Sequence, residues 1–152
     1  MEPPFERVYT VNDWYDGPRV GFADLGGVPH AYLSIWLDDV EDWDPAYRLW
    51  PVSPEILALA LEDWAIWERW QDAFHAGETT LETHPALLPD APRHAEIGPV
   101  ITAFLESAPA DARLALGDFR LVDRRQLGWV GKMRPLEVCW APVDSPSAES
   151  VE

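Results

Sequence analysis

The fold is decided by residues 18–37, which read PRVGFADLGGVPHAYLSIWL. Gly26 and Gly27 supply the positive φ angles that a two-residue hairpin turn needs. If they form the loop, Gly21 faces Tyr32 and Ala23 faces His30 across two antiparallel strands. One face of the hairpin is then apolar, and the other sets each large ring over a small residue. The apolar face would consist of Val20, Phe22, Ala31, Leu33, Ile35 and Leu37.

Further strands are expected on both sides of this hairpin. Residues 7–14 are rich in β-branched and aromatic side chains and precede an Asp-Gly-Pro turn at 16–18. The acidic stretch 38–44 should form a loop, and 46–52 should return as a strand. Two late strands are predicted at 113–122 and 128–140, the second with Pro135 inside it, which is typical of an edge or a bulge.

Two helices are expected between the early and late strands. Ser53 is a suitable N-cap before Pro54, and apolar periodicity continues to about Ala76, where Gly77 ends it. The broad apolar face of this tryptophan-rich helix would carry Ile56, Leu57, Ala60, Trp64, Trp67, Trp70 and Phe74. A second helix ends near Ser107 and is interrupted at Gly98-Pro99.

This order of elements predicts an α+β fold: an antiparallel sheet of about five to six strands, with the long Trp-rich helix and the Pro-interrupted helix packed on one face. Residues 1–142 should form a single domain, and the small, acidic residues 143–152 a disordered tail.

The composition restricts the classes of function. The 152 residues include 27 Asp and Glu against 11 Lys and Arg, a net charge of −16, so binding to nucleic acid or an anionic membrane is disfavoured. A single cysteine cannot form an internal disulfide. Without an apolar run of spanning length or a signal-peptide pattern, the expected location is the cytoplasm.

One carboxylate departs from the amphipathic pattern of the long helix. Asp63 lies inside the apolar arc, so it must be paired, hydrogen-bonded or protonated. It could be the acid of a pocket under a tryptophan wall, or a structural group bonded to an indole N–H or an arginine. The first alternative predicts a small-molecule or metal site between the N-terminal sheet and the helix. Its candidate residues are Asp63, Trp67, Trp70, His30 and Tyr32.

Recognisable catalytic motifs are missing from the sequence. His75, His84 and His94 are weak metal-ligand candidates, because their spacing matches no short-range ligand motif. No Gly-x-Ser-x-Gly elbow or phosphate-binding glycine loop occurs, and Cys139 lies in an apolar strand, as an inert thiol does. We therefore expect no cofactor and a protein that is not an enzyme, with a small enzyme as the alternative.

The acidic loop is the candidate interface. Its five carboxylates favour a non-enzymatic binding protein that engages a basic protein partner, as inhibitors, immunity proteins and nucleic-acid mimics do. The basic segment 120–134 could face this loop in the same molecule or in a second copy, so self-association is an open alternative. The interface residues are Asp38, Asp39, Glu41, Asp42 and Asp44.

A longer pattern, WYDGPxxGxADxxGxPHxY, runs from Trp14 to Tyr32. With the residues around Asp63 and the pairs His84-Pro85 and Arg93-His94, it resembles a family of short, uncharacterised bacterial proteins. The resemblance implies a bacterial, single-domain, cytoplasmic protein and carries over no functional residue.

Overall fold

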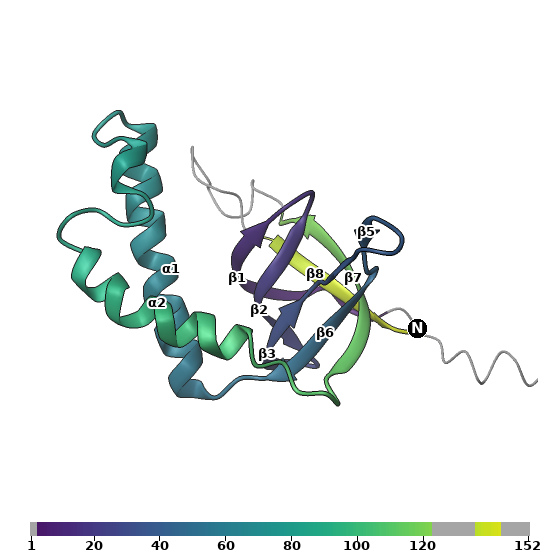
Figure 1. Cartoon of the computed structure of the whole chain (residues 1–152). Helices are drawn as coiled ribbons and strands as arrows, with labels where there is room; N and C mark the ends of the chain where they lie inside the picture. Colours follow the sequence, from purple (N-terminus) through teal and green to yellow (C-terminus); the bar gives the residue numbers. More distant parts are fainter. Residues whose placement is uncertain (1–2, 123–135, 144–152) are drawn as a thin grey trace, which may run out of the picture.

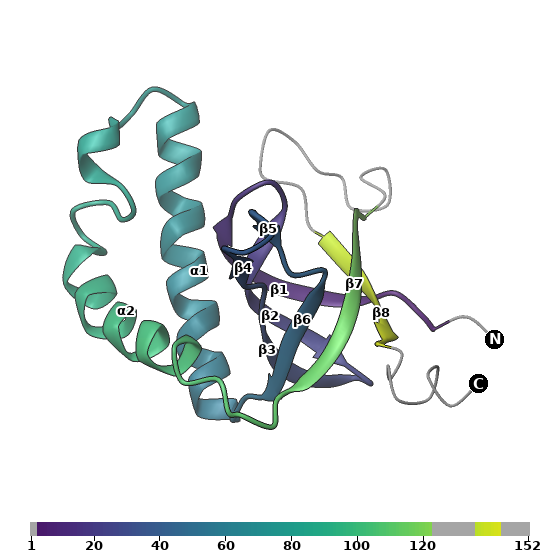
Figure 2. The ribbon, with the colours of Figure 1, turned by 45° about the vertical axis from the view of Figure 1, so that its right-hand side comes forward.

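A computed structural model describes residues 3–122 and 136–143. Six antiparallel strands close into a barrel in the order β1-β2-β3-β6-β7-β8, and two helices lie beside it as a separate layer (Figures 1 and 2). The barrel strands are β1 (Glu6–Trp14), β2 (Pro18–Leu25), β3 (Val28–Leu33), β6 (Ala46–Pro51), β7 (Arg113–Leu121) and β8 (Leu136–Pro142). The remaining elements are the short strands β4 (Trp36–Leu37) and β5 (Asp42–Trp43), the helices α1 (Pro54–His75) and α2 (Ala91–Leu105), and the 3-10 turn η1 (Leu81–Thr83).

The register predicted for the central hairpin is confirmed. Gly21 pairs with Tyr32 and Ala23 with His30, across a turn in which Gly26 and Gly27 have φ angles of 62° and 76°. Both faces of the hairpin are buried, because one face lines the barrel and the other packs under the helices. Because both faces are buried, β2 and β3 lack the regular alternation of apolar and polar residues that is typical of a sheet with one face in water.

Closure of the barrel depends on a bent first strand. The pairing of β1 with β2 shifts register around Thr10 and again near Asp13, and such irregularities bend a strand and increase its twist. The bent strand pairs with β8 through Glu6 and Arg7, which closes the sheet. The sequence predicted an antiparallel sheet with helices on one face; closure means that the helices pack against the outside of a barrel.

Four aromatic rings fill the barrel interior. Neighbouring rings have centroids 5.4–6.2 Å apart, and small residues on the facing strands leave room for them. At Gly21 an added Cβ would lie 2.3 Å from the Thr10 carbonyl oxygen and 2.6 Å from the Tyr32 hydroxyl. Burial raises the pKa of Tyr32 well above its ordinary value, so its hydroxyl stays protonated and donates to the Thr10 oxygen at 2.9 Å. The four rings are Tyr32, Tyr47, Phe119 and Trp140.

The helices are inserted between two strands that are neighbours in the barrel. The chain leaves after β6, forms α1, η1 and α2, and returns as β7, which pairs directly with β6. The Ser53 side chain caps α1 by accepting from the Ile56 amide, and α2 runs through Pro99 to Leu105. A second core forms where the helices meet the outside of the barrel, and it contains Phe22, Ala31, Trp50, Ile66, Ile97 and Ile101.

The structure revises one local expectation and extends another, and two lie outside the described residues. The acidic stretch 38–44 is not only a loop, because β4 and β5 pair around its tip. The predicted apolar face of α1 is buried or half-buried at every position, and Ile66 and Ala73 join Ala60 and Trp70 as its buried residues, since this helix packs against both α2 and the barrel. The predicted tail at 143–152, apart from Val143, and the strand start at 128–135 lie outside the described residues.

Candidate functional site: a groove between the barrel and the helices

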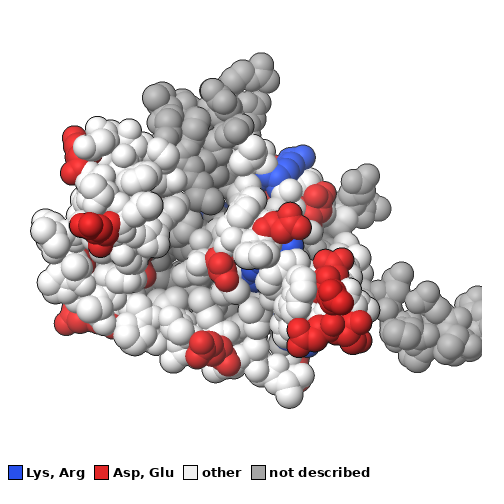
Figure 3. Space-filling model, turned by 45° about the horizontal axis from the view of Figure 1, so that its top comes forward, with Lys and Arg blue, Asp and Glu red and all other residues white. Residues whose placement is uncertain are grey.

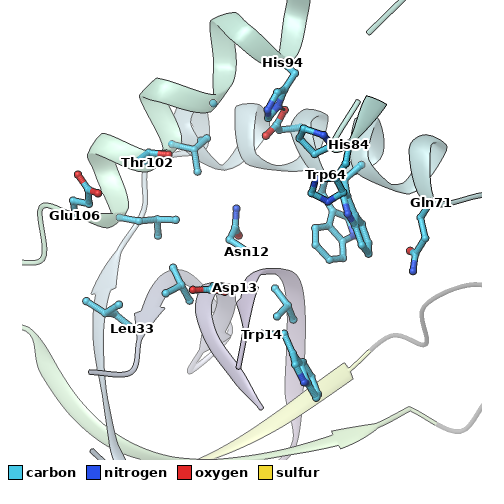
Figure 4. Close-up of a pocket in the computed structure, with 18 residues that line it drawn as sticks. Asn12, Asp13, Trp14, Leu33, Trp64, Gln71, His84, His94, Thr102 and Glu106 are labelled. Atoms are coloured by element: carbon cyan, nitrogen blue, oxygen red, sulfur yellow. Dashed lines mark hydrogen bonds and ion pairs between the residues drawn. The ribbon is translucent and has the colours of Figure 1, made fainter. Parts of the chain in front are cut away.

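A groove of about 820 Å³ lies where β1 faces the two helices. Its volume is in the range of sites that hold small molecules. Most of its side chains come from β1, α1, α2 and the connection between the helices, and β2 and β3 contribute Val20 and Leu33 (Figure 4). The polar members among them are Asn12, Asp13, Asp63, Gln71, His84, His94, Thr102 and Glu106.

The inward carboxylate of α1 is bonded to a histidine of α2. His94 Nδ1 lies 2.7 Å from Asp63 Oδ1, and the two side chains are 32% and 18% exposed. With the Asp63 oxygen as acceptor, the Nδ1–H group of His94 donates this hydrogen bond. The sequence predicted an indole or an arginine as structural partner, and the structure provides an imidazole. Nε2 of His94 forms no hydrogen bond with any described residue.

The space beside this imidazole is kept open by a glycine. Gly98 lies one helical turn after His94, and a Cβ at this position would come within 3.5–3.9 Å of the ring. The groove therefore reaches the imidazole edge without a side chain from the next turn of α2 covering it. In Figure 4, His94 points from α2 toward the space between the helices and the barrel.

Tryptophans form the apolar wall of the groove. Trp64 and Trp67 of α1 have ring centroids 4.8 Å apart at an interplanar angle of 31°, and both are half-buried. Trp14 reaches the groove from the end of β1 and is exposed. Indole faces attract cations as well as apolar groups, since their π-systems carry negative charge above the ring.

The irregular part of β1 places an amide in the groove. Thr10 is buried at the first register shift, accepts from the Phe22 amide at 3.2 Å, and donates to Asn12 Oδ1 at 2.6 Å. This bond occupies the Asn12 oxygen and leaves its NH₂ group as a donor. Figure 4 shows Asn12 pointing from the barrel into the groove.

Ion pairs hold the helical side of the groove together. Arg93 of α2 bonds Glu62 of α1 at 2.6 Å, and Arg69 of α1 bonds Asp90 at the start of α2 at 2.9 Å. The hydrogen bond from Arg93 holds the pKa of Glu62 below its ordinary value, and that from Arg69 does the same for Asp90. Together with the Asp63–His94 bond, these pairs join the two helices that line the site.

The structure brings two of the five predicted pocket residues into the groove. Asp63 and Trp67 line it, whereas Tyr32 is sealed inside the barrel. Trp70 is buried, and its indole donates to Thr83 Oγ1 at 2.9 Å, so it holds η1 against α1. His30 lies at the start of β3, where its Nδ1 bonds the Val28 carbonyl oxygen.

The three later histidines lie in different places. His84 and His94 both line the groove, but His75 is at the end of α1 beside the Phe74 ring. Among the described residues, no group of three or more His, Cys, Asp or Glu side chains could hold a metal ion.

Several groove residues were not singled out from the sequence as site residues. Trp64 was placed on the apolar face of its helix, and its position beside Asp63 and one turn before Trp67 was the available signal. No such signal marks four other polar residues of the groove, because only the bend of β1 and the placement of α2 bring them there. These residues are Asn12, Asp13, Thr102 and Glu106.

Comparison with protein-family models, with curated proteins and with solved structures found no significant match to this chain. Within the described residues, neither helix has the length and apolar character needed to cross a membrane.

Proposed function

We propose that this chain is a binding protein for a small organic cation, and that the groove is its binding site. One observation carries the proposal: the described lining combines a tryptophan wall with three carboxylates and contains no lysine or arginine. An ammonium or guanidinium group would gain both charge pairing and ring contact there. The three carboxylates are Asp13, Asp63 and Glu106.

The net charge of the chain also favours a positively charged ligand. With −16 over the whole chain, the surrounding field attracts cations and raises their local concentration. Figure 3 shows one face on which carboxylates are spread over both the helical and the barrel parts, with few basic side chains. The apolar groove floor, which includes Val20, Leu33 and Leu105, favours a cation that also carries an apolar body.

A pair of ligands that differ in charge tests this proposal. Phenethylamine and 3-phenylpropanoate share a phenyl ring on a short chain and carry opposite charges. We expect the amine to bind at least about tenfold more tightly by calorimetric or NMR titration, a difference of about 1.4 kcal/mol. Equal binding of the two, or tighter binding of the carboxylate, would falsify the proposal.

Variants locate the site. Glu106→Gln and Asp13→Asn should each weaken binding of the amine severalfold, because both side chains are exposed carboxylates of the lining. Asp111→Asn removes an equal charge from an exposed position outside the lining and should change the affinity little. If all three variants weaken binding equally, the amine responds to net charge and does not occupy the groove.

A second candidate function, proton transfer by His94, is supported by its bond to Asp63. A carboxylate that accepts from Nδ1 leaves the lone pair of Nε2 as a base toward the groove. Long-range ¹⁵N NMR of the neutral imidazole should show the Nδ1–H tautomer, and the Nε2 resonance should shift when phenethylamine is added. An Nε2–H tautomer that does not respond to the amine would exclude this second function.

A further inference from the structure

The short hairpin formed by β4 and β5 stands outside the barrel sheet. Trp36 pairs with Trp43 and Leu37 with Asp42, and the four residues between them form an exposed tip. Neither strand contributes a residue to the two buried cores. The tip consists of Asp38, Asp39, Val40 and Glu41.

Large apolar side chains are exposed on and beside this hairpin. Tyr15 is 67% exposed, Val40 61% and Trp36 45%. The Trp43 ring contacts the two aromatic ones, with its centroid 6.0 Å from that of Tyr15 and 5.3 Å from that of Trp36. Contiguous exposed aromatic groups of this kind mark interaction sites on soluble proteins, where Trp and Tyr supply much of the binding energy. We call these four residues and the tip the hairpin surface.

Arg19 holds the hairpin surface in a defined arrangement. Its guanidinium lies over the Trp43 ring at 4.4 Å and donates to the carbonyl oxygens of Tyr15 and Asp16, each at 2.7 Å. A further bond reaches Ser34 Oγ at 3.3 Å. The β1–β2 turn and the hairpin are therefore pre-organised relative to each other, which lowers the entropy lost on binding a partner.

We propose that the hairpin surface docks an arginine-rich segment of a partner protein. The tip carries three exposed carboxylates on the same hairpin as Trp36 and Trp43, and Asp42 adds a fourth at its base. Arginine fits both features, because its planar guanidinium pairs with carboxylates through two hydrogen bonds and stacks on aromatic faces. This surface is separate from the groove, since none of its residues lines the groove.

Labelled oligoarginine and oligolysine peptides of equal length test the proposal on the full chain. We expect oligoarginine to bind more tightly than oligolysine in fluorescence polarisation, with an affinity that falls as salt is added. Trp36→Ala should weaken oligoarginine binding about tenfold, and Trp36→Tyr should retain most of it. Asp39→Asn should weaken it less and reduce the salt dependence.

Leu88→Ala is the matched control, because Leu88 is an exposed apolar residue on the helical side of the molecule. Circular dichroism should show that each variant keeps the fold. Equal binding of the two peptides, or a Trp36→Ala variant that binds as the unmodified chain does, would overturn the proposal.

A competition experiment separates the hairpin surface from the groove. Saturation of the groove with phenethylamine should leave peptide binding unchanged. Loss of peptide binding when phenethylamine saturates the groove would also overturn the proposal for the hairpin surface. Failure of phenethylamine to bind would contradict only the proposed function of the groove.

Discussion

At the residue scale, Gly21 shows how one missing side chain allows the barrel to be packed. The Tyr32 ring lies over Gly21, and its hydroxyl bonds the Thr10 carbonyl oxygen of the next strand. Any Cβ at position 21 would overlap both the Thr10 carbonyl oxygen and the Tyr32 hydroxyl oxygen. The same arrangement recurs at Gly117, where a Cβ would lie 2.6 Å from the Trp140 ring. The rings of Tyr32 and Trp140 thus fit inside the barrel because Gly21 of β2 and Gly117 of β7 have no side chain where these rings lie.

Gly21→Ala should therefore destabilise the protein by about 3 kcal/mol, since both the Thr10 oxygen and the buried Tyr32 ring would have to move. Urea unfolding followed by tryptophan fluorescence measures the change. Gly98→Ala is the control: its Cβ would meet no atom closer than 3.5 Å, and alanine should stabilise the helix interior by about 0.5–1 kcal/mol. Similar destabilisation by both substitutions would contradict the packing described for the barrel.

At the element scale, the helical pair depends on charged contacts as well as on its apolar core. Glu62, Asp63 and Arg69 of α1 all bond residues at or near the start of α2. Both helices also contribute to one apolar core, so these polar bonds add to the burial that fixes how α2 lies along α1. The groove depends on that placement, because both helices contribute to its lining.

The Arg93–Glu62 pair predicts how this contact responds to pH. The pKa of Glu62 is lower in the folded chain than in the unfolded chain, owing first to the hydrogen bond from Arg93. Its stabilising contribution is therefore complete above the unfolded value, about 4.3, and is lost as pH falls through the lower folded value. Glu62→Gln should lower the melting temperature slightly at neutral pH, and the difference from the unmodified chain should disappear in strong acid.

Thermal melts of both proteins across this pH range provide the measurement. Glu78→Gln is the comparison, because Glu78 is exposed and forms no ion pair within the described residues. A Glu62→Gln difference that stays constant down to strong acid would show that the pair contributes nothing to stability.

At the scale of the whole molecule, the helices and the barrel share one apolar interface. Phe22 points outward from β2 and stacks on Phe104 of α2, with ring centroids 6.1 Å apart. Trp50 of β6 contacts the same Phe104 ring at 6.0 Å. Because this core includes residues of the barrel and of both helices, we expect the two layers to unfold together.

Phe22→Ala should lower the free energy of unfolding by about 3–5 kcal/mol, since the side chain is fully buried and its removal leaves a cavity between the layers. Helix content by circular dichroism and tryptophan fluorescence should still report a single coincident transition. Val40→Ala, at an exposed position, should change stability by less than about 0.5 kcal/mol. Two separated transitions in the unmodified chain would contradict a shared core.

The sequence by itself determined the local structure. The Gly26-Gly27 turn and the two-residue alternation of side chains define the register of β2 with β3, and the Ser53 cap with Gly77 defines the bounds of α1. Both signals act within a few residues, where backbone geometry leaves few alternatives. Asp63 was recognised in the same way, because helical periodicity alone puts it on the apolar side.

Only the tertiary structure decided that the sheet closes, that His94 is the partner of Asp63, and that Asn12 and Glu106 meet at one groove. Closure joins β1 to β8, and the Asp63–His94 bond joins residues 31 positions apart. Such long-range contacts depend on the bend of β1 and on how α2 packs against α1 and the barrel. No local pattern encodes them, because their free energy comes from burial shared among elements that are distant in sequence.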